Sequence, residues 1–292
     1  MAQKGAIPFY FGRSSFTPDA VEIGEFTWSA SSGPSSSVTI SCRPKTENRA
    51  VFWNCLAKGT LAFGRADDGY QPDFRFWGIS FGNSKMEHLI HYSDKKYTAA
   101  QRAAGTYQGK VRIEIVKSRY VDLSDPKNEL ITDPSDAAKF KVEDQEFWLP
   151  KKKLGAQSPF FHALFTSDFK ENQEEKYVLE SVTLEEFLHF AGIVHSFGMP
   201  IDAKSVEYLL RLADMFQCDM VHQRCVEFLL KATKEDIETK EKLILADRYD
   251  LKEVLLDTVD KIKPNEAKVL CRNSPFLQDL LTERVCIIET EE

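Results

Sequence analysis

The chain has 292 residues and a mass of 33.3 kDa, enough for about two domains of ordinary size. Hydrophobic residues make up 42% of the chain and charged residues 28%, which excludes a wholly disordered protein. No apolar run approaches the roughly 20 residues that a membrane-spanning helix needs. The first residues also lack the basic, apolar and small-residue regions of a secretory signal. We therefore expect an intracellular protein, cytoplasmic or nuclear or both, that does not bind membranes.

Charge is distributed unevenly along the chain. Residues 1–135 hold 17 Lys/Arg and 14 Asp/Glu, a net charge of +3, whereas residues 136–292 hold 21 and 31, a net charge of -10. Nucleic-acid affinity comes largely from clustered cations, so the acidic half argues against a nucleic-acid partner. The one basic run, Lys151 to Lys153, is more typical of a solvated surface turn than of a functional patch.

The first 120 residues have the pattern of short strands. Apolar residues alternate there, or occur in short bursts rich in aromatic and β-branched types, at 38–42, 50–56, 74–81 and 111–115. A period of two predicts strands. Turn-forming residues separate these segments, for example at 31–37 and 67–69. The pattern predicts an antiparallel β-sandwich over residues 1–121.

Residues 122–134 carry two Asp-Pro steps and little apolar periodicity, which predicts a linker. A strand hairpin is expected next, with strands at 138–142 and 146–149 around a turn at 143–145. Helical patterns then dominate the rest of the chain.

Several helix starts and apolar stripes can be placed in this second half. Ser158 before Pro159 predicts an N-cap followed by proline at the first helical position, and Thr183 to Glu186 has the spacing of a capping box. Further helices are expected from apolar stripes at 206–216 and 221–229, from a pair at about 235–248 and 251–262, and from a second Ser-Pro start at 274–275.

Catalytic and metal-binding patterns are weak. The two histidines of His88 to His91 lack the spacing of a zinc H-E-x-x-H motif, and Cys225 lies on the apolar side of a helical pattern, where a thiolate is disfavoured. Cys42 and Cys55, with the two histidines, invite a zinc proposal, but twelve residues separate the cysteines where compact zinc sites place two to four. We expect free thiols, no metal, no cofactor and no enzymatic activity.

Residues 135–230 resemble a BTB/POZ domain over nearly their whole length. Four segments follow the family's patterns in order: F-x-V-H-K-x-x-L at 147–154, S-x-x-F at 158–161, L-L-x-x-A-D at 209–214 and C-x-x-F-L at 225–229. Two departures are clear, because Pro150 stands where the family usually has His, and His195 to Phe197 replace the family's Y-T-G. The resemblance implies an α/β BTB/POZ domain over residues 135–231.

The same resemblance implies partners. Members of the family typically form homodimers, and the corresponding interface positions here are Asp136, Leu154, Ser158, Phe161 and Leu164. Burial within a single chain is the alternative reading of each. Many members also bind Cullin-3 through a hydrophobic-x-Glu motif after the third helix, which Phe169-Lys170-Glu171 matches in pattern and position.

The flanking regions resemble parts of BTB proteins as well. Residues 232–292 look like a helical extension, the 3-box or start of a BACK region, that deepens the cullin-binding groove in such adaptors. Phe26 to Trp28, Trp77 to Phe81 and 111–116 resemble motifs of a MATH domain. That resemblance places Trp77 and Ile79 near a groove for substrate peptides, with burial in the sandwich core as the alternative.

Together these features predict an α+β multidomain chain that acts as a non-catalytic substrate-recognition adaptor of a Cullin-3 RING ubiquitin ligase. Its expected partners are Cullin-3, a second copy of itself and a protein substrate held by the N-terminal domain. One alternative is a BTB dimerisation scaffold or transcriptional corepressor platform that does not bind cullin. Another is an enzyme housed in the β domain, motivated by its unassigned His and Cys.

Overall fold

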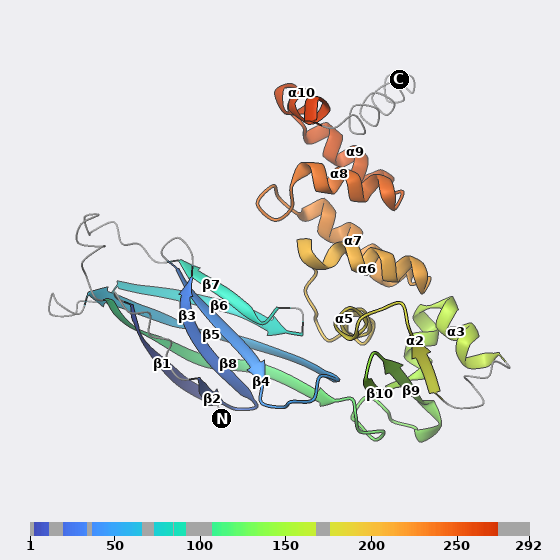
Figure 1. Ribbon diagram of the computed structural model, residues 1–292, viewed down its shortest axis with the longest axis horizontal. Coiled ribbons are helices and arrows are strands. Elements are labelled where there is room, and N and C mark those ends of the chain that lie inside the picture. The colour runs from blue at the N-terminus through green and yellow to red at the C-terminus, as the bar shows by residue number, and fades with distance from the viewer. Residues whose placement is uncertain are drawn as a thin grey trace. The chain divides into compact units, whose positions relative to one another are not determined.

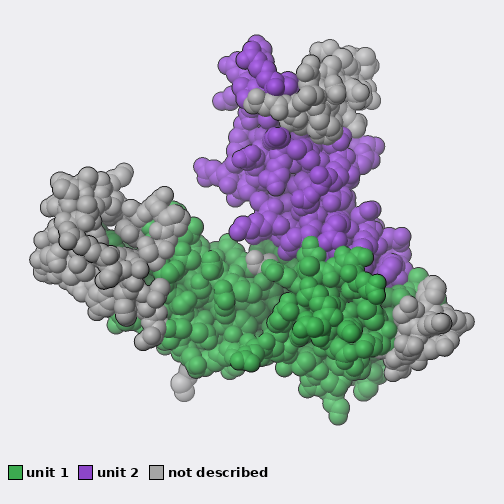
Figure 2. All heavy atoms as spheres, in the orientation of Figure 1, with its two compact units in different colours: residues 1–154, 162–200 green, residues 155–161, 201–292 purple. Residues whose placement is uncertain are grey.

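The computed structural model describes residues 3–11, 20–33, 37–65, 73–83, 85–91, 107–167 and 176–273. It divides into two compact units, coloured separately in Figure 2: residues 1–154 with 162–200 form unit 1, and residues 155–161 with 201–292 form unit 2. The sequence-based division into residues 1–121, 122–134, 135–231 and 232–292 stays a prediction, because the two units are defined by spatial contacts and do not follow these boundaries.

The N-terminal part of unit 1 contains two four-stranded antiparallel sheets (Figure 1). One sheet has the order β1 (Gln3–Phe11), β8 (Tyr107–Asp122), β5 (Val51–Arg65), β6 (Asp73–Gly82). The other has the order β2 (Val21–Ile23), β3 (Phe26–Gly33), β4 (Ser37–Pro44), β7 (Glu87–His91). The predicted antiparallel β-sandwich is confirmed.

The sandwich core is built from the inward residues of both sheets, because every second side chain of a strand faces the opposite sheet. Trp28 of β3 meets Phe81 of β6 edge-on, with ring centroids 5.1 Å apart. Phe26 and Trp53 pack with their centroids 5.4 Å apart. All four side chains are buried, as expected when the apolar positions of an alternating strand face the opposite sheet.

The segment expected to be a linker is held by hydrogen bonds within unit 1. The Leu123 backbone donates to Ala50 O at 2.9 Å and accepts from Trp148 N at 2.8 Å. Asn128 is buried, and its Nδ2 donates to Trp148 O at 3.1 Å. A short 3-10 helix, η1 (Pro134–Asp136), follows. Residues 123–128 therefore connect the end of β8 to the next sheet, and hydrogen bonds to Ala50 and Trp148 hold them in place.

The second part of unit 1 contains a three-stranded mixed sheet. Its order is β10 (Gln145–Pro150), β9 (Ala137–Val142), β11 (Lys176–Leu179), with β10 antiparallel and β11 parallel to β9. The expected hairpin is confirmed, but its turn is shorter than the expected 143–145, because β10 begins at Gln145 and pairs it with Val142. Glu143 takes the left-handed conformation that this tight turn requires (φ 54°). Phe140, Phe147 and Phe187 pack beneath this sheet with ring centroids 5.5–5.9 Å apart.

Three helices follow the hairpin: α2 (Lys151–Gln157), α3 (Pro159–Thr166) and α5 (Leu184–Val194). The helix start at Ser158-Pro159 is confirmed, because Ser158 Oγ accepts from Phe161 N at 3.1 Å. The capping box is confirmed as well: Thr183 Oγ1 accepts from Glu186 N, and Glu186 Oε2 accepts from Thr183 N.

The described remainder of unit 2, residues 201–273, is mostly helical. Its elements are α6 (Ala203–Met215), α7 (Asp219–Lys231), α8 (Thr239–Arg248), α9 (Lys252–Lys261) and α10 (Pro264–Asn273). Helices α6 and α7 pack together, as do α8 and α9, and α7 also contacts α9. The apolar stripes expected at 206–216 and 221–229 supply buried residues such as Leu209 and Val221.

One helix boundary differs from the prediction. Helix α8 begins at Thr239 rather than near residue 235, because Asp236 Oδ2 accepts from both the backbone N and the Oγ1 of Thr233 and closes a local turn there. The helix start expected at 274–275 lies outside the described residues. None of the described helices is long and apolar enough to cross a membrane.

Candidate functional site

The residues that resemblance places at a dimer interface are mostly buried within the single chain. In unit 1, Asp136 is 8% exposed and its Oδ1 accepts from Lys152 N at 2.7 Å, while Leu154 is buried. Asp136 thus supports the first turn of α2, where a carboxylate is favoured by the helix dipole. Leu164 of α3 is half-buried.

Two more of these residues meet within unit 2. Ser158 is buried, and its Oγ donates to Phe216 O while accepting from Phe161 N. The Phe161 ring is fully buried and lies 4.8 Å from the ring of Phe216, centroid to centroid. Ser158 therefore links the two helices, with one hydrogen bond to the start of α3 and one to the residue that ends α6. A role of these residues in a dimer stays a prediction.

The expected cullin-binding residues, Phe169, Lys170 and Glu171, lie outside the described residues. The structure describes the chain up to residue 167 and again from residue 176, where β11 begins. Their proposed role is therefore argued from sequence alone.

The expected substrate-binding residues lie on β6, which is an edge strand among the described strands of its sheet. Trp77 is 7% exposed and belongs to the sandwich core, and Ile79 packs partly buried against that core. The same strand presents Phe74 and Phe76 outward, 54% and 85% exposed. Our sequence reasoning missed this outward pair, although the alternation of a strand implies it once Trp77 faces inward.

The departure from the family pattern at His195 to Phe197 has a structural consequence within unit 1. Phe197 O accepts from Asn54 Nδ2 of β5 at 2.6 Å, and the Phe197 ring lies 5.0 Å from that of Phe52. The Arg119 guanidinium lies 4.1 Å from the Phe197 ring centroid, within the range of a cation-π contact. The segment after α5 thus binds the β-sandwich by a hydrogen bond, an aromatic contact and a cation.

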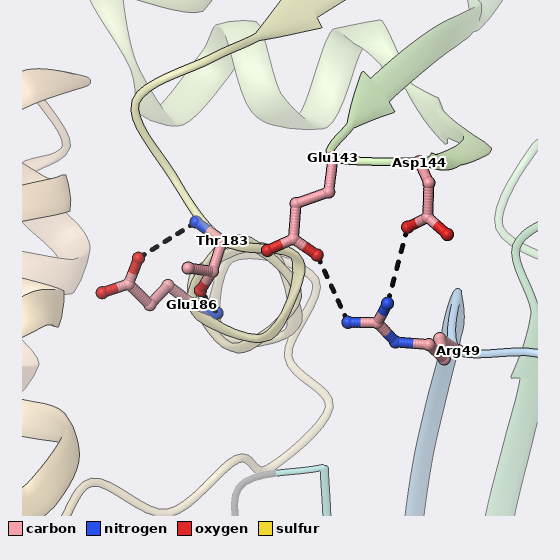
Figure 3. A network of polar contacts seen from close by, with 5 residues as sticks. All are labelled: Arg49, Glu143, Asp144, Thr183 and Glu186. Carbon is pink, nitrogen blue, oxygen red and sulfur yellow. Dashed lines mark hydrogen bonds and ion pairs between the residues drawn. The ribbon is translucent and has the colours of Figure 1, made fainter.

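A second set of contacts within unit 1 surrounds Arg49, which follows β4 (Figure 3). Its two terminal nitrogens bind Glu143 at 3.2 Å and Asp144 at 3.5 Å, both in the hairpin turn between β9 and β10. Arg49 also lines a cavity of about 290 Å³, together with Trp53 and Met86 of the sandwich and Leu188 of α5. The exposed ion pairs add little stability by themselves.

The cysteines of the described residues fit a structural interpretation. Cys42, Cys55, Cys218 and Cys225 are free and buried. Burial raises the pKa of Cys225 to about 12, so its thiolate is strongly disfavoured at neutral pH. Burial and the neighbouring Cys55 also raise the pKa of Cys42. Within the described ranges, no three His, Cys, Asp or Glu side chains lie close enough to hold a metal ion.

Comparison with known proteins identifies one of the domains. The BTB/POZ domain family matches residues 132–233. "BTB and MATH domain-containing protein 38" of Caenorhabditis elegans is 36% identical over 108 residues, which cover 37% of this chain and 27% of the relative. "BTB and MATH domain-containing protein 15" of the same species is 28% identical over 122 residues, 41% of this chain and 43% of the relative.

A third relative pairs the BTB domain with a different partner domain. "Kelch repeat and BTB domain-containing protein 4" of Macaca fascicularis is 24% identical over 162 residues, 56% of this chain and 26% of the relative. The chain thus spans less than half the length of each of these three relatives. The chain therefore contains a BTB/POZ domain at residues 132–233, with an antiparallel β-sandwich ahead of it and helices after it, and it is similar to proteins whose names combine BTB and MATH domains.

Proposed function

We propose that this protein is a non-catalytic substrate-recognition adaptor of a Cullin-3 RING ubiquitin ligase, which dimerises through its BTB domain. The β-sandwich holds a protein substrate, and the BTB domain with its helical extension engages the cullin. The observation that carries the proposal is the order of domains, because a BTB/POZ domain follows a β-sandwich in one chain, and the names of two relatives combine BTB and MATH domains. Catalysis then belongs to the partners.

The sandwich offers a surface suited to a protein partner. Phe74 and Phe76 are large apolar side chains exposed on a strand that lies at the edge of its sheet among the described strands, a position that favours a partner segment. Exposed aromatic residues of this kind often supply most of the energy of a small interface. In the adaptor, Trp77 and Ile79 position this strand from its inner face and border the peptide groove.

The helical extension offers a second surface, within unit 2. A groove of about 160 Å³ lies between α6 and α8, with Ile244 and Leu245 among its lining residues. Arg248 of α8 forms an ion pair with Glu207 of α6, which holds the two helices together at the groove. The apolar side chains of Ile244 and Leu245, set among charged lining residues, support the proposed contribution of the extension to cullin binding.

Dimerisation supplies the reason for combining these surfaces in one chain. Two substrate-binding domains on one particle raise the effective concentration of the second binding event. Weak substrate contacts then become tight by avidity. Light scattering of the purified protein should show a dimer at micromolar concentration, and a monomer would remove this part of the mechanism.

Cullin-3 binding separates the adaptor from a BTB scaffold. A pull-down with the wild-type chain and with Phe169→Ala/Glu171→Ala should show Cullin-3 retained by the wild type and lost by the double variant. Val178→Ala/Glu180→Ala is the matched control, because it removes an exposed apolar side chain and an exposed carboxylate at the same spacing on β11 and just after it. This control should retain Cullin-3.

Two results would contradict the proposal. If the folded wild-type chain does not bind Cullin-3, the dimerisation scaffold or corepressor platform replaces the adaptor. If the Phe169/Glu171 variant binds as well as the wild type, the assignment of the cullin-binding motif is wrong. Circular dichroism of each variant confirms that the protein tested is folded.

A further inference from the structure

Unit 2 contains a small cavity of about 140 Å³ bounded by the connection after α7, the start of α8 and the end of α9. Its polar lining consists of three lysines and three threonines: Lys234, Lys242, Lys261, Thr233, Thr239 and Thr258. Apolar residues, among them Ile237 and Ile262, complete the walls. The cavity is too small for a nucleotide or another ligand of that size.

Lys242 is the unusual member of this set. It is 6% exposed, yet its ammonium group makes no hydrogen bond among the described residues. The nearest carboxylate oxygen, Asp257 Oδ2, lies 3.9 Å from its Nζ, beyond hydrogen-bond distance. An ammonium group has three protons to donate, and those of Lys242 meet no hydrogen-bond acceptor among the described residues.

The neighbouring carboxylates compensate Lys242 only in part, through the ion pair with Asp257 at 3.9 Å. Asp257 is already bound by Lys261 at 2.6 Å, and Glu266 is bound by Lys234 and by Thr239 Oγ1. Three ammonium groups therefore face two carboxylates, which leaves one positive charge in excess. Burial lowers the pKa of Lys242, and Lys261 lowers it further against the opposing effect of Asp257.

The backbone adds a second attraction for an anion. Thr239 is the first residue of α8, and the N-cap, Glu238, makes no side-chain hydrogen bond to the first turn. The start of a helix of ten residues carries a partial positive charge and N–H groups that point away from the helix. Anions bind readily at such positions.

We propose that this cavity binds a phosphoryl group, with Lys242 as its principal ligand and Lys234 and Lys261 beside it. A phosphoryl group presents three strong acceptor oxygens and more than one negative charge, which suits several lysines better than a single carboxylate does. The group is either the side chain of a phosphorylated peptide or free phosphate. The site is independent of cullin binding and of the substrate surface on β6.

Phosphate itself is the first probe. Thermal unfolding of the wild type and of Lys242→Met is followed in potassium phosphate and in potassium chloride of equal ionic strength. Phosphate should raise the unfolding temperature of the wild type more than that of Lys242→Met, because a ligand that binds only the folded state stabilises it, whereas the general stabilising effect of phosphate salts acts on both proteins. Isothermal titration then measures the affinity.

Lys242→Met tests the site itself, because it removes the charge and keeps the length of the side chain. The variant should bind phosphate about tenfold more weakly or worse, the loss expected for one charged hydrogen-bond donor. Lys240→Met is the matched control, since Lys240 is exposed on the same helix and does not line the cavity. This control should bind as the wild type does.

A phosphoserine peptide and its unphosphorylated form distinguish the two sources of the phosphoryl group. Tighter binding of the phosphopeptide than of phosphate assigns the site to phosphorylated protein, and binding of phosphate alone assigns it to the free ion. The proposal is overturned if neither probe acts differently from chloride or the unphosphorylated peptide. It is also overturned if Lys242→Met binds as tightly as Lys240→Met.

Discussion

His195 should make the stability of this protein depend on pH in the weakly acidic range. It follows α5, it is 3% exposed, and its Nε2 has no hydrogen-bond partner. Its ring lies 6.0 Å from that of Phe52. Burial lowers the pKa of His195 from its ordinary value of 6.5 to about 3, with smaller contributions from the positive charges of Lys153 and Arg119. The folded state therefore keeps this imidazole neutral.

The sign and size of the effect follow from proton linkage. Between pH 6.5 and about 3, the unfolded chain binds a proton at this position and the folded chain does not. The free energy of unfolding therefore falls as the pH falls through this window. At pH 5 the protonation of the unfolded state is worth about 2 kcal/mol, and this amount is absent at pH 7 and above.

Urea unfolding at pH 7 and pH 5 measures this difference. In His195→Phe, which places an apolar ring beside Phe52, the loss of unfolding free energy between the two pH values should be smaller than in the wild type by about 2 kcal/mol. His162→Gln, which removes an exposed histidine of α3, controls for the loss of a histidine as such. An equal loss in wild type and His195→Phe would refute the reasoning.

Two further predictions test the packing. A Cβ atom at Gly59 would lie 1.8 Å from Arg112 O of the neighbouring strand, whereas one at Gly78 would meet nothing closer than 3.9 Å. Gly59→Ala should therefore lower the free energy of unfolding by at least about 3 kcal/mol or prevent soluble expression, whereas Gly78→Ala should lower it by about 1 kcal/mol or less. Urea unfolding measures both losses, and equal losses would contradict the geometry. In the native protein at pH 8, iodoacetamide should label the half-exposed Cys271 well before Cys225, whose pKa burial raises to about 12. Peptide mass spectrometry reads out both sites, and comparable labelling of Cys225 without denaturant would show that the α7 core opens.

Local signals in the sequence were good predictors of local structure. The capping box at Thr183, the N-cap at Ser158 and the hairpin turn at Glu143 all depend on residues within a few positions of each other. The start of α8 was placed about four residues too early, because apolar periodicity does not report the competing turn that Asp236 closes.

The candidate sites were harder to predict from sequence. Motif resemblance selected Trp77 and Ile79 on β6, whereas the large apolar side chains that this strand exposes are Phe74 and Phe76. Resemblance names positions in a pattern, whereas exposure depends on which face of the strand meets the opposite sheet. Lys242 had no sequence signal, since a lysine on a helix is usually solvated and its burial depends on what packs around it.

The sequence by itself determined the two classes of secondary structure, most helix and turn boundaries, and the resemblance to a BTB/POZ domain. These features rest on alternation, capping and motif order, which act over short stretches of chain. Only the tertiary structure decided that Asn54 binds Phe197, 143 positions further on, and that Lys234, Lys242 and Lys261 surround one cavity. Such contacts join segments that are distant in sequence, so neither periodicity nor local propensity specifies them.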